Sequence, residues 1–361
     1  MERNYTIDYV KFIAVVLVVG VHTFTYNINW QDNLFIYGLI HYFPRWVIPY
    51  FFIVSGYLLG VKISFLKQRK DYLNQYLFKL VKLFVTWFFI YVLFDLMNRV
   101  VYSIYFDKNI WLEIMNYFHD FFRVTLLYDG VIGTGFHLWF LTALIWSILI
   151  LYIFIYLDRV HFILLLGFLL NIIGLFGQTY GSIFQVSFDT RDALFFGLFY
   201  ITLGYYIGSN NDAIINKCEK VKSRYLILIF ILSSIMQVTE KVSIYHWFAA
   251  TDGIGEYYLS TIPMTVSLFI LVLKYRYLGK NNIIADLGGA AVGIYVAHMV
   301  ILSTVILLMQ FLNIDHWREN YIVNLVLVLI VIYISYYTYI LINTFLFHFK
   351  NLLMNRKEVT L

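Results

Sequence analysis

Long apolar runs recur along the whole chain, and polar connections separate them. The first runs from Ile7 to Tyr26, and further runs follow at 43–61, 76–98, 137–157, 160–177, 192–208, 223–240, 257–274, 283–311 and 321–347. An α-helix of about 20 apolar residues is long enough to cross a bilayer. The pattern therefore predicts an all-α integral membrane protein, a bundle of about ten transmembrane helices, with residues 1–361 forming one polytopic domain.

Composition agrees with this pattern and excludes several classes. Of 361 residues, 61% are hydrophobic and 13% are charged, whereas a soluble chain has about 45–50% apolar and about 25% charged residues. The net charge of +5 is small and dispersed, so we expect membrane lipid and no nucleic acid as partner. Cys218 is the one cysteine, and no Cys/His cluster has metal-ligand spacing, so we expect neither an internal disulfide nor a metal site.

The loop charges predict the orientation in the membrane. Lysine and arginine gather after the second, sixth and eighth runs, at 62–82, 217–224 and 274–280. Because such residues accumulate on the cytoplasmic side, both termini are predicted to be cytoplasmic.

The longest stretch between runs, 99–136, is then predicted to be extracytoplasmic. Aromatic residues at spacings of three and four, among them Trp111, Phe118 and Phe122, give it one face of an interfacial helix. Such a helix could be a lid over an external cavity or a plain surface helix.

Two ionisable residues lie inside the first run. Lys11 and His22 are eleven positions apart, which is about 16 Å along a helix axis and places them on nearly the same face. A charged group at the centre of a span costs about 2.5–3.5 kcal/mol, so each is a functional candidate. A histidine there could take a proton from a hydroxyl, or it could simply hydrogen-bond to a neighbouring helix.

Other polar residues near the runs have two interpretations each. Lys79 and Lys82 share one helix face and could hold a nucleotide phosphate, although the positive-inside rule also explains them. Arg191 could bind an anionic or sugar substrate, or form an ion pair with a neighbouring aspartate. Small residues at 288–293 allow close helix packing but leave His298 unexplained.

Five motifs in order resemble the membrane acyltransferase-3 family. This family includes bacterial O-acetyltransferases and the membrane part of glycopeptide-resistance serine racemases. The similar segments are the first run up to His22, the proline-aromatic-Ser-Gly-Tyr segment at 47–57, Phe-His-Leu-Trp-Phe-Leu at 136–141, the segments at 173–177 and 190–197, and Gly-Ile-Tyr-Val-Ala-His at 293–298.

The resemblance implies a membrane-embedded O-acyltransferase in a bacterial-type cell membrane. An acyl-CoA, with acetyl-CoA expected, would supply the acyl group from the cytoplasm. A hydroxyl of a cell-surface glycan, a lipid-linked sugar or a small molecule would accept it. His22 matches the catalytic histidine, acting as general base or in acyl relay. Lys11, Lys79 and Lys82 match donor-binding positions, where the family usually has arginine.

The remaining matched polar and aromatic positions are expected on the acceptor side. These are Ser55, Tyr57, His137, Trp139, Arg191 and His298. Trp139 also suits an interfacial anchor. A transporter or exporter of a small polar molecule such as an amino acid is the alternative, because the same buried charges could line a transport cavity and lysine lacks the planar fork of arginine.

Overall fold

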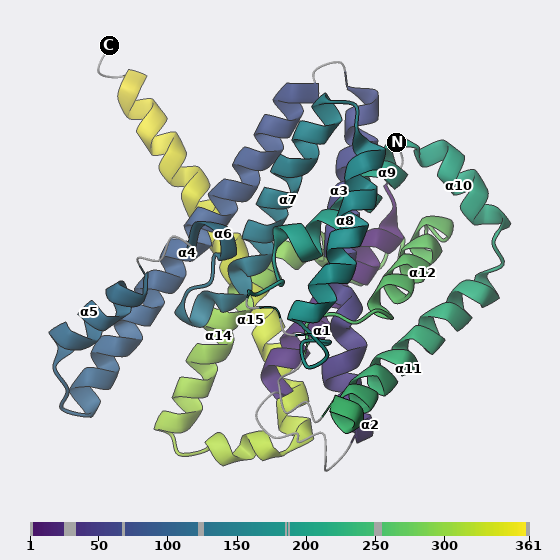
Figure 1. Ribbon diagram of the computed structural model, residues 1–361. Coiled ribbons are helices and arrows are strands. Elements are labelled where there is room, and N and C mark those ends of the chain that lie inside the picture. Colours follow the sequence, from purple (N-terminus) through teal and green to yellow (C-terminus); the bar gives the residue numbers. More distant parts are fainter. Residues whose placement is uncertain are drawn as a thin grey trace.

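The computed structural model describes residues 3–24, 34–66, 69–121, 126–184, 186, 188–248 and 255–358, and within these ranges it is helical with no strands (Figure 1). The helices are α1 (Tyr5–Phe24), α2 (Leu34–Tyr37), α3 (Val47–Phe65), α4 (Arg69–Tyr105), α5 (Ile110–Phe121), α6 (Leu126–Asp129), α7 (Trp139–Tyr156), α8 (Val160–Gly174), α9 (Leu198–Ser209), α10 (Asn211–Lys220), α11 (Ser223–Phe248), α12 (Thr261–Lys274), α13 (Ile283–Gly289), α14 (Ala291–Phe311) and α15 (Tyr321–Glu358). Short turns of 3₁₀ or π geometry accompany them: η1 (Gly38–Tyr42), η2 (Phe43–Trp46), η3 (Gly133–Leu138), η4 (Leu175–Gly177), η5 (Ala193–Gly197) and η6 (Asp315–Glu319).

Eight helical stretches of the described chain are long and apolar enough to cross a membrane. They are Tyr5–Phe24, Leu34–Phe65, Arg69–Tyr105, Gly133–Tyr156, Val160–Gly177, Ser223–Phe248, Ala291–Phe311 and Tyr321–His348. Two more of the expected runs form shorter apolar helices, Ala193–Ser209 and Thr261–Lys274. The all-helical membrane architecture is thus confirmed, while the number of ten spans stays a prediction.

The expected single helix at 283–311 is instead two helices, because the chain departs from helical geometry at Ala290. Two glycines precede the break, and glycine costs about 1 kcal/mol relative to alanine inside a helix. One of them, Gly288, lies so close to α1 that a Cβ there would collide with the backbone carbonyl of Asp8. The small residues therefore serve close packing, as the sequence predicts, but they also end α13.

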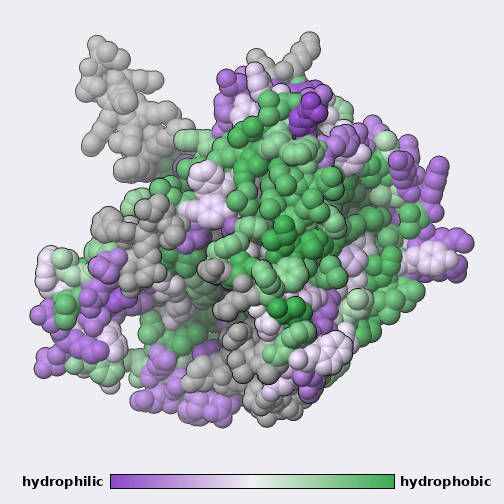
Figure 2. All heavy atoms as spheres, viewed as in Figure 1, coloured by the Kyte–Doolittle hydropathy of each residue, from purple (hydrophilic) through white to green (hydrophobic). Residues whose placement is uncertain are grey.

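The outer surface carries many exposed apolar side chains. Exposed leucine, isoleucine, valine and phenylalanine side chains follow α4, α11 and α15. Figure 2 shows a broad apolar area over the middle of the molecule, with hydrophilic side chains gathered toward its ends. Helices that are apolar all round belong in a lipid environment. In Figure 1 the start of α1 and the far end of α15 lie toward the same end of the bundle; its assignment to the cytoplasm stays a prediction.

The helix expected within 99–136 is present as α5, and α4 continues to Tyr105 before it. Tyr117 is buried and packs with Phe118 against α4, whereas Trp111 is exposed. Phe122 lies outside the described residues. The position of α5 at the membrane surface stays a prediction.

The backbones of α3 and α9 touch along two pairs of glycines. A Cβ at Gly56 or Gly60 of α3 would collide with backbone carbonyls of α9, and one at Gly204 or Gly208 of α9 would collide with carbonyls of α3. Each helix thus presents two glycines four residues apart, the spacing that allows close helix approach in membranes. The contacts advance together along both helices, so α3 and α9 run parallel.

We predict that Gly56→Ala destabilises the protein by about 1–3 kcal/mol, because the added methyl group must push two packed backbones apart. Gly20→Ala is the matched control: Gly20 is also inside a helix, and among the described residues no atom outside its own helix backbone and chain neighbours lies within 4 Å of the position of its Cβ. That control should leave the stability unchanged or raise it slightly. Apparent melting temperatures of the detergent-purified variants test this, and equal values for the two variants would contradict the proposed packing constraint.

Candidate active site

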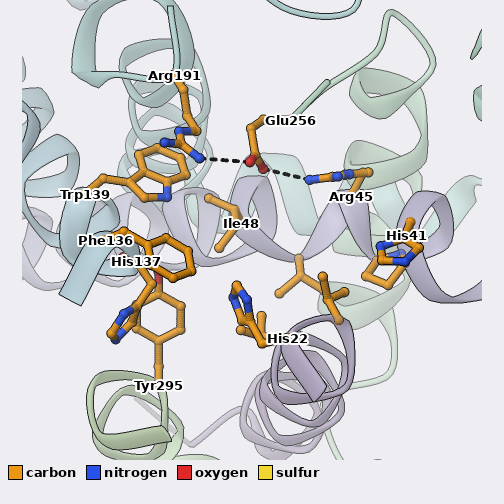
Figure 3. A pocket seen from close by; sticks show the side chains of 14 residues that line it. His22, His41, Arg45, Ile48, Phe136, His137, Trp139, Arg191, Glu256 and Tyr295 are labelled. Atoms are coloured by element: carbon orange, nitrogen blue, oxygen red, sulfur yellow. Dashed lines mark hydrogen bonds and ion pairs between the residues drawn. The ribbon is translucent and has the colours of Figure 1, made fainter. Parts of the chain in front are cut away.

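A cavity of about 310 Å³ lies where the ends of several helices meet. Its walls come from α1, η1, η2, α3, η3, α7, α14 and two connecting loops. The lining residues are Val18, Val21, His22, His41, Pro44, Arg45, Val47, Ile48, Phe136, His137, Trp139, Arg191, Glu256 and Tyr295. Figure 3 shows Glu256 between two arginines, with His22 across Ile48 from it in this view.

Three charged side chains from distant parts of the chain form one ion network at this cavity. Glu256 accepts from Arg45 Nη1 at 2.7 Å through one carboxylate oxygen and from Arg191 Nη1 at 3.0 Å through the other (Figure 3). Burial alone would raise the pKa of the Glu256 carboxyl, but the two arginines outweigh it and leave the pKa below its ordinary value. Glu256 is therefore ionised near neutral pH and joins two walls of the cavity.

The loop that carries Arg191 is fixed by hydrogen bonds of the residues just before it. The buried hydroxyl of Thr190 donates to the Gly174 carbonyl at 2.6 Å, and the Arg191 backbone N–H donates to Asp189 at 2.8 Å. Gln178 donates to the same Asp189 oxygen and accepts from the Glu256 backbone N–H at 3.1 Å. The Arg191 guanidinium also stacks 5.2 Å from the ring centre of Trp139, a favourable cation–π contact.

Three histidines lie side by side at the other wall. The ring centre of His298 lies 5.3 Å from that of His22 and 4.8 Å from that of His137. His298 is fully buried, and its Nδ1 contacts the Tyr295 carbonyl. Since a carbonyl only accepts, Nδ1 carries the proton of the neutral ring and Nε2 keeps its lone pair. Among the described residues, that Nε2 has no hydrogen-bond partner.

The turn that carries His137 is anchored from α4. Asp95 accepts hydrogen bonds from the Thr134 backbone N–H, at 3.2 Å, and from the Thr134 hydroxyl, and Tyr117 donates to it at 3.3 Å. From the opposite side, the Tyr295 hydroxyl donates to the His137 carbonyl at 2.7 Å. The histidine is therefore held between α4 and α14.

The structure brings some sequence-predicted residues together and leaves others apart. His22, His137, Trp139 and Arg191 line the cavity, and His298 lies against His22. The Tyr57 hydroxyl donates to Asn211 at 2.8 Å, and Ser55 interacts with Tyr76. Lys11 forms an ion pair with Asp8 at 2.7 Å, and Lys79 and Lys82 are exposed on α4. The predicted site residues that do not line the cavity are Ser55, Tyr57, Lys11, Lys79 and Lys82.

Sequence reasoning did not single out Arg45, Glu256 or Asp95. Asp95 lies inside an apolar run and Arg45 near the start of one, so the cost of placing charge in a membrane points to both. Glu256 stands one residue before a run and resembles an ordinary loop carboxylate. Its role depends on contacts with Arg45 and Arg191, which lie 211 and 65 positions away along the chain. No local sequence pattern reveals such contacts.

Comparison with known proteins identifies the family of the chain. Residues 4–343 match the acyltransferase domain of the acyltransferase-3 family. The chain therefore belongs to this family of membrane acyltransferases, as its motifs indicate.

Two curated relatives are more distant. One is an amino-acid racemase of Enterococcus faecalis, 26% identical over 297 residues that cover 78% of this chain and 37% of that protein. The other is a serine/alanine racemase of Enterococcus gallinarum, 23% identical over 345 residues that cover 91% of this chain and 45% of that protein. The chain thus spans less than half the length of either relative. No solved structure matches the chain.

We predict that Glu256→Gln lowers the stability at neutral pH by about 1–3 kcal/mol, because two partly buried arginines lose their charged partner. The carboxyl has a lowered pKa in the fold. Its stabilisation is therefore complete above the ordinary carboxyl pKa of about 4.3 and is lost as the pH falls through the lower folded value.

Apparent melting temperatures of wild type and variant between pH 3 and 8 test this prediction. The two curves should be separated near pH 7 and converge in acid. Glu113→Gln is the control, because Glu113 pairs at 3.3 Å with one arginine, Arg99, which is more exposed than Arg45 and Arg191. Its effect should stay below about 1 kcal/mol. A separation for Glu256→Gln that does not change with pH would contradict the assignment.

Proposed function

We propose that this membrane protein is an O-acyltransferase that moves an acyl group, acetyl in the simplest case, from cytoplasmic acyl-CoA to a hydroxyl of a cell-surface glycan, a lipid-linked sugar or a small molecule. Membership of the acyltransferase-3 family supports the reaction class. The observation that carries the proposal is His22 at the wall of a cavity of about 310 Å³, where an acceptor hydroxyl and a thioester can meet beside one imidazole.

In the proposed reaction His22 acts as general base. Its imidazole takes the proton of the acceptor hydroxyl while the hydroxyl oxygen attacks the thioester carbonyl. The carbon–sulfur bond then breaks, and the CoA thiolate leaves and receives the proton from His22. The buried ring of His298 packs against His22 and is itself held by His137, which keeps His22 beside the cavity.

The donor is proposed to bind from the end of the bundle where α4 begins. Lys79 and Lys82 are three residues apart on an exposed stretch of α4, where two ammonium groups can meet CoA phosphates. The pantetheine arm would then extend between the helices toward His22. Lys11, partly buried beside Asp8, lies on the way along α1.

His22→Ala should reduce acetyl transfer from labelled acetyl-CoA in membranes by about 10²–10⁴-fold, the usual contribution of a general base. His161→Ala is the matched control, because His161 is exposed on α8 and contacts Tyr206, outside the cavity lining. Normal transfer by His22→Ala, at equal amounts of folded protein, would refute this mechanism.

Acetyl-CoA and CoA should raise the melting temperature of the purified protein, since a ligand that binds only the folded state stabilises it. The shift should disappear in the double variant Lys79→Ala/Lys82→Ala. Lys217→Ala/Lys220→Ala is the control, because these lysines are also exposed and three apart, on α10, and should leave the shift intact. A full shift of the melting temperature in Lys79→Ala/Lys82→Ala would mean that the donor binds at another site.

Transport of a small polar molecule such as an amino acid is the second candidate. The curated relatives carry names of amino-acid racemases, and the cavity presents charges of both signs. Accumulation of labelled serine or alanine in sealed vesicles without any CoA would favour this function. A strict requirement for CoA would exclude it.

A further inference from the structure

We infer that the acceptor bound in the cavity carries one carboxylate besides its reacting hydroxyl, and that Arg45 and Arg191 hold this carboxylate. The role of the hydroxyl in this inference rests on the proposed function. The binding of a carboxylate by the two arginines rests on the structure alone. Its basis is the charge of the cavity, the unused donors of the arginines and the size of the space.

The charged groups of the cavity do not cancel. Two guanidinium groups face one carboxylate, Glu256, while the other polar lining residues are histidines and a tyrosine, which carry no negative charge near neutral pH. The two described carboxylates beside Arg191 in the sequence are engaged elsewhere. Asp189 is exposed and accepts from the Arg191 backbone and from Gln178, and Asp192 accepts from Phe195 N–H and Tyr128. The charged residues of the described lining, Arg45, Arg191 and Glu256, therefore leave a net charge of +1 for a ligand.

Both arginines keep donors for that ligand. Each gives one terminal nitrogen, Nη1, to Glu256, whereas a guanidinium has five N–H groups. Arg45 Nε is buried and, among the described residues, has no hydrogen-bond partner. A guanidinium fork matches the two oxygens of a carboxylate, so a second carboxylate can share the pair that Glu256 already joins.

The charge balance selects a monoanion. A carboxylate brings the cavity from +1 to neutral, whereas a phosphate dianion would leave an excess negative charge beside the partly buried Glu256, which is unfavourable.

The size of the cavity also limits the ligand. A volume of about 310 Å³ is at the small end of ligand pockets, which span about 300–1,000 Å³. With Phe136, Trp139 and Ile48 as walls, the space suits one sugar ring or a molecule of similar size.

Binding of three matched sugars to the purified protein tests the anion site without any transfer. The probes are glucose, glucuronate and glucose 6-phosphate, measured by calorimetry. We expect glucuronate to bind at least 10-fold more tightly than either of the others. Arg191→Gln should remove this preference, while Arg99→Gln, which breaks the ion pair with Glu113 outside the cavity, should retain it.

Glu256→Gln should have the opposite effect on the affinity for anionic sugars. It raises the cavity charge to +2, so folded variant protein should bind glucuronate more tightly than wild type and should accept glucose 6-phosphate as well. Equal binding of glucose and glucuronate to wild type, binding of neither, or an unchanged preference in Arg191→Gln would overturn the inference.

Transfer assays with the same sugars separate this inference from the proposed function. Acetylation of glucose as efficiently as glucuronate would refute the carboxylate site but leave the acyltransferase intact. Tight binding of glucuronate, lost in Arg191→Gln, with no transfer to any hydroxyl compound would retain the anion site and refute the acyltransferase. Acetylation of glucuronate in preference to glucose would support both.

Discussion

The backbone contact between α3 and α9 is the constraint on which the candidate site depends. Paired glycines let the two helices touch, and each glycine lies against a carbonyl of the facing helix, so the helices have little freedom to slide. Arg45 stands just before α3, and Arg191 stands just before η5 and α9. Because the helices are parallel, their contact brings both arginines to the same end, where one carboxylate can join them.

The second wall of the cavity has a different origin. His22 lies in the last turn of α1, His137 lies on a turn held by Asp95, and His298 is buried within α14. Their rings pack against one another while the arginines lie across the cavity. The imidazole of His22 thus faces a positively charged wall, and the space between them suits a small molecule with one anionic group.

Apolar periodicity and length predict most of the helices, since spans in lipid must be long and apolar. The motifs also identify the family and most of the residues around His22. The apolar run at 283–311 predicts one helix because apolar residues continue through Ala290, and the two glycines before the break are only a weak signal beside the length of that run. The role of Glu256 was not predicted for another reason. Its neighbours in the sequence indicate a loop, and the two arginines that it binds come near it only in the folded chain. Lys79 and Lys82 lie outside the cavity lining, so a role for them requires a donor that reaches inward.

Site-directed modification of Ile48, which lines the cavity between the arginines and His22, tests most directly that acyl transfer takes place there. In a Cys218→Ser background, Ile48→Cys would be labelled with a bulky thiol reagent, and acetyl transfer would be measured before and after complete labelling. Loss of transfer on labelling, with protection by bound acceptor, is expected if this cavity is the reaction site. Unchanged transfer by fully labelled protein would contradict that assignment.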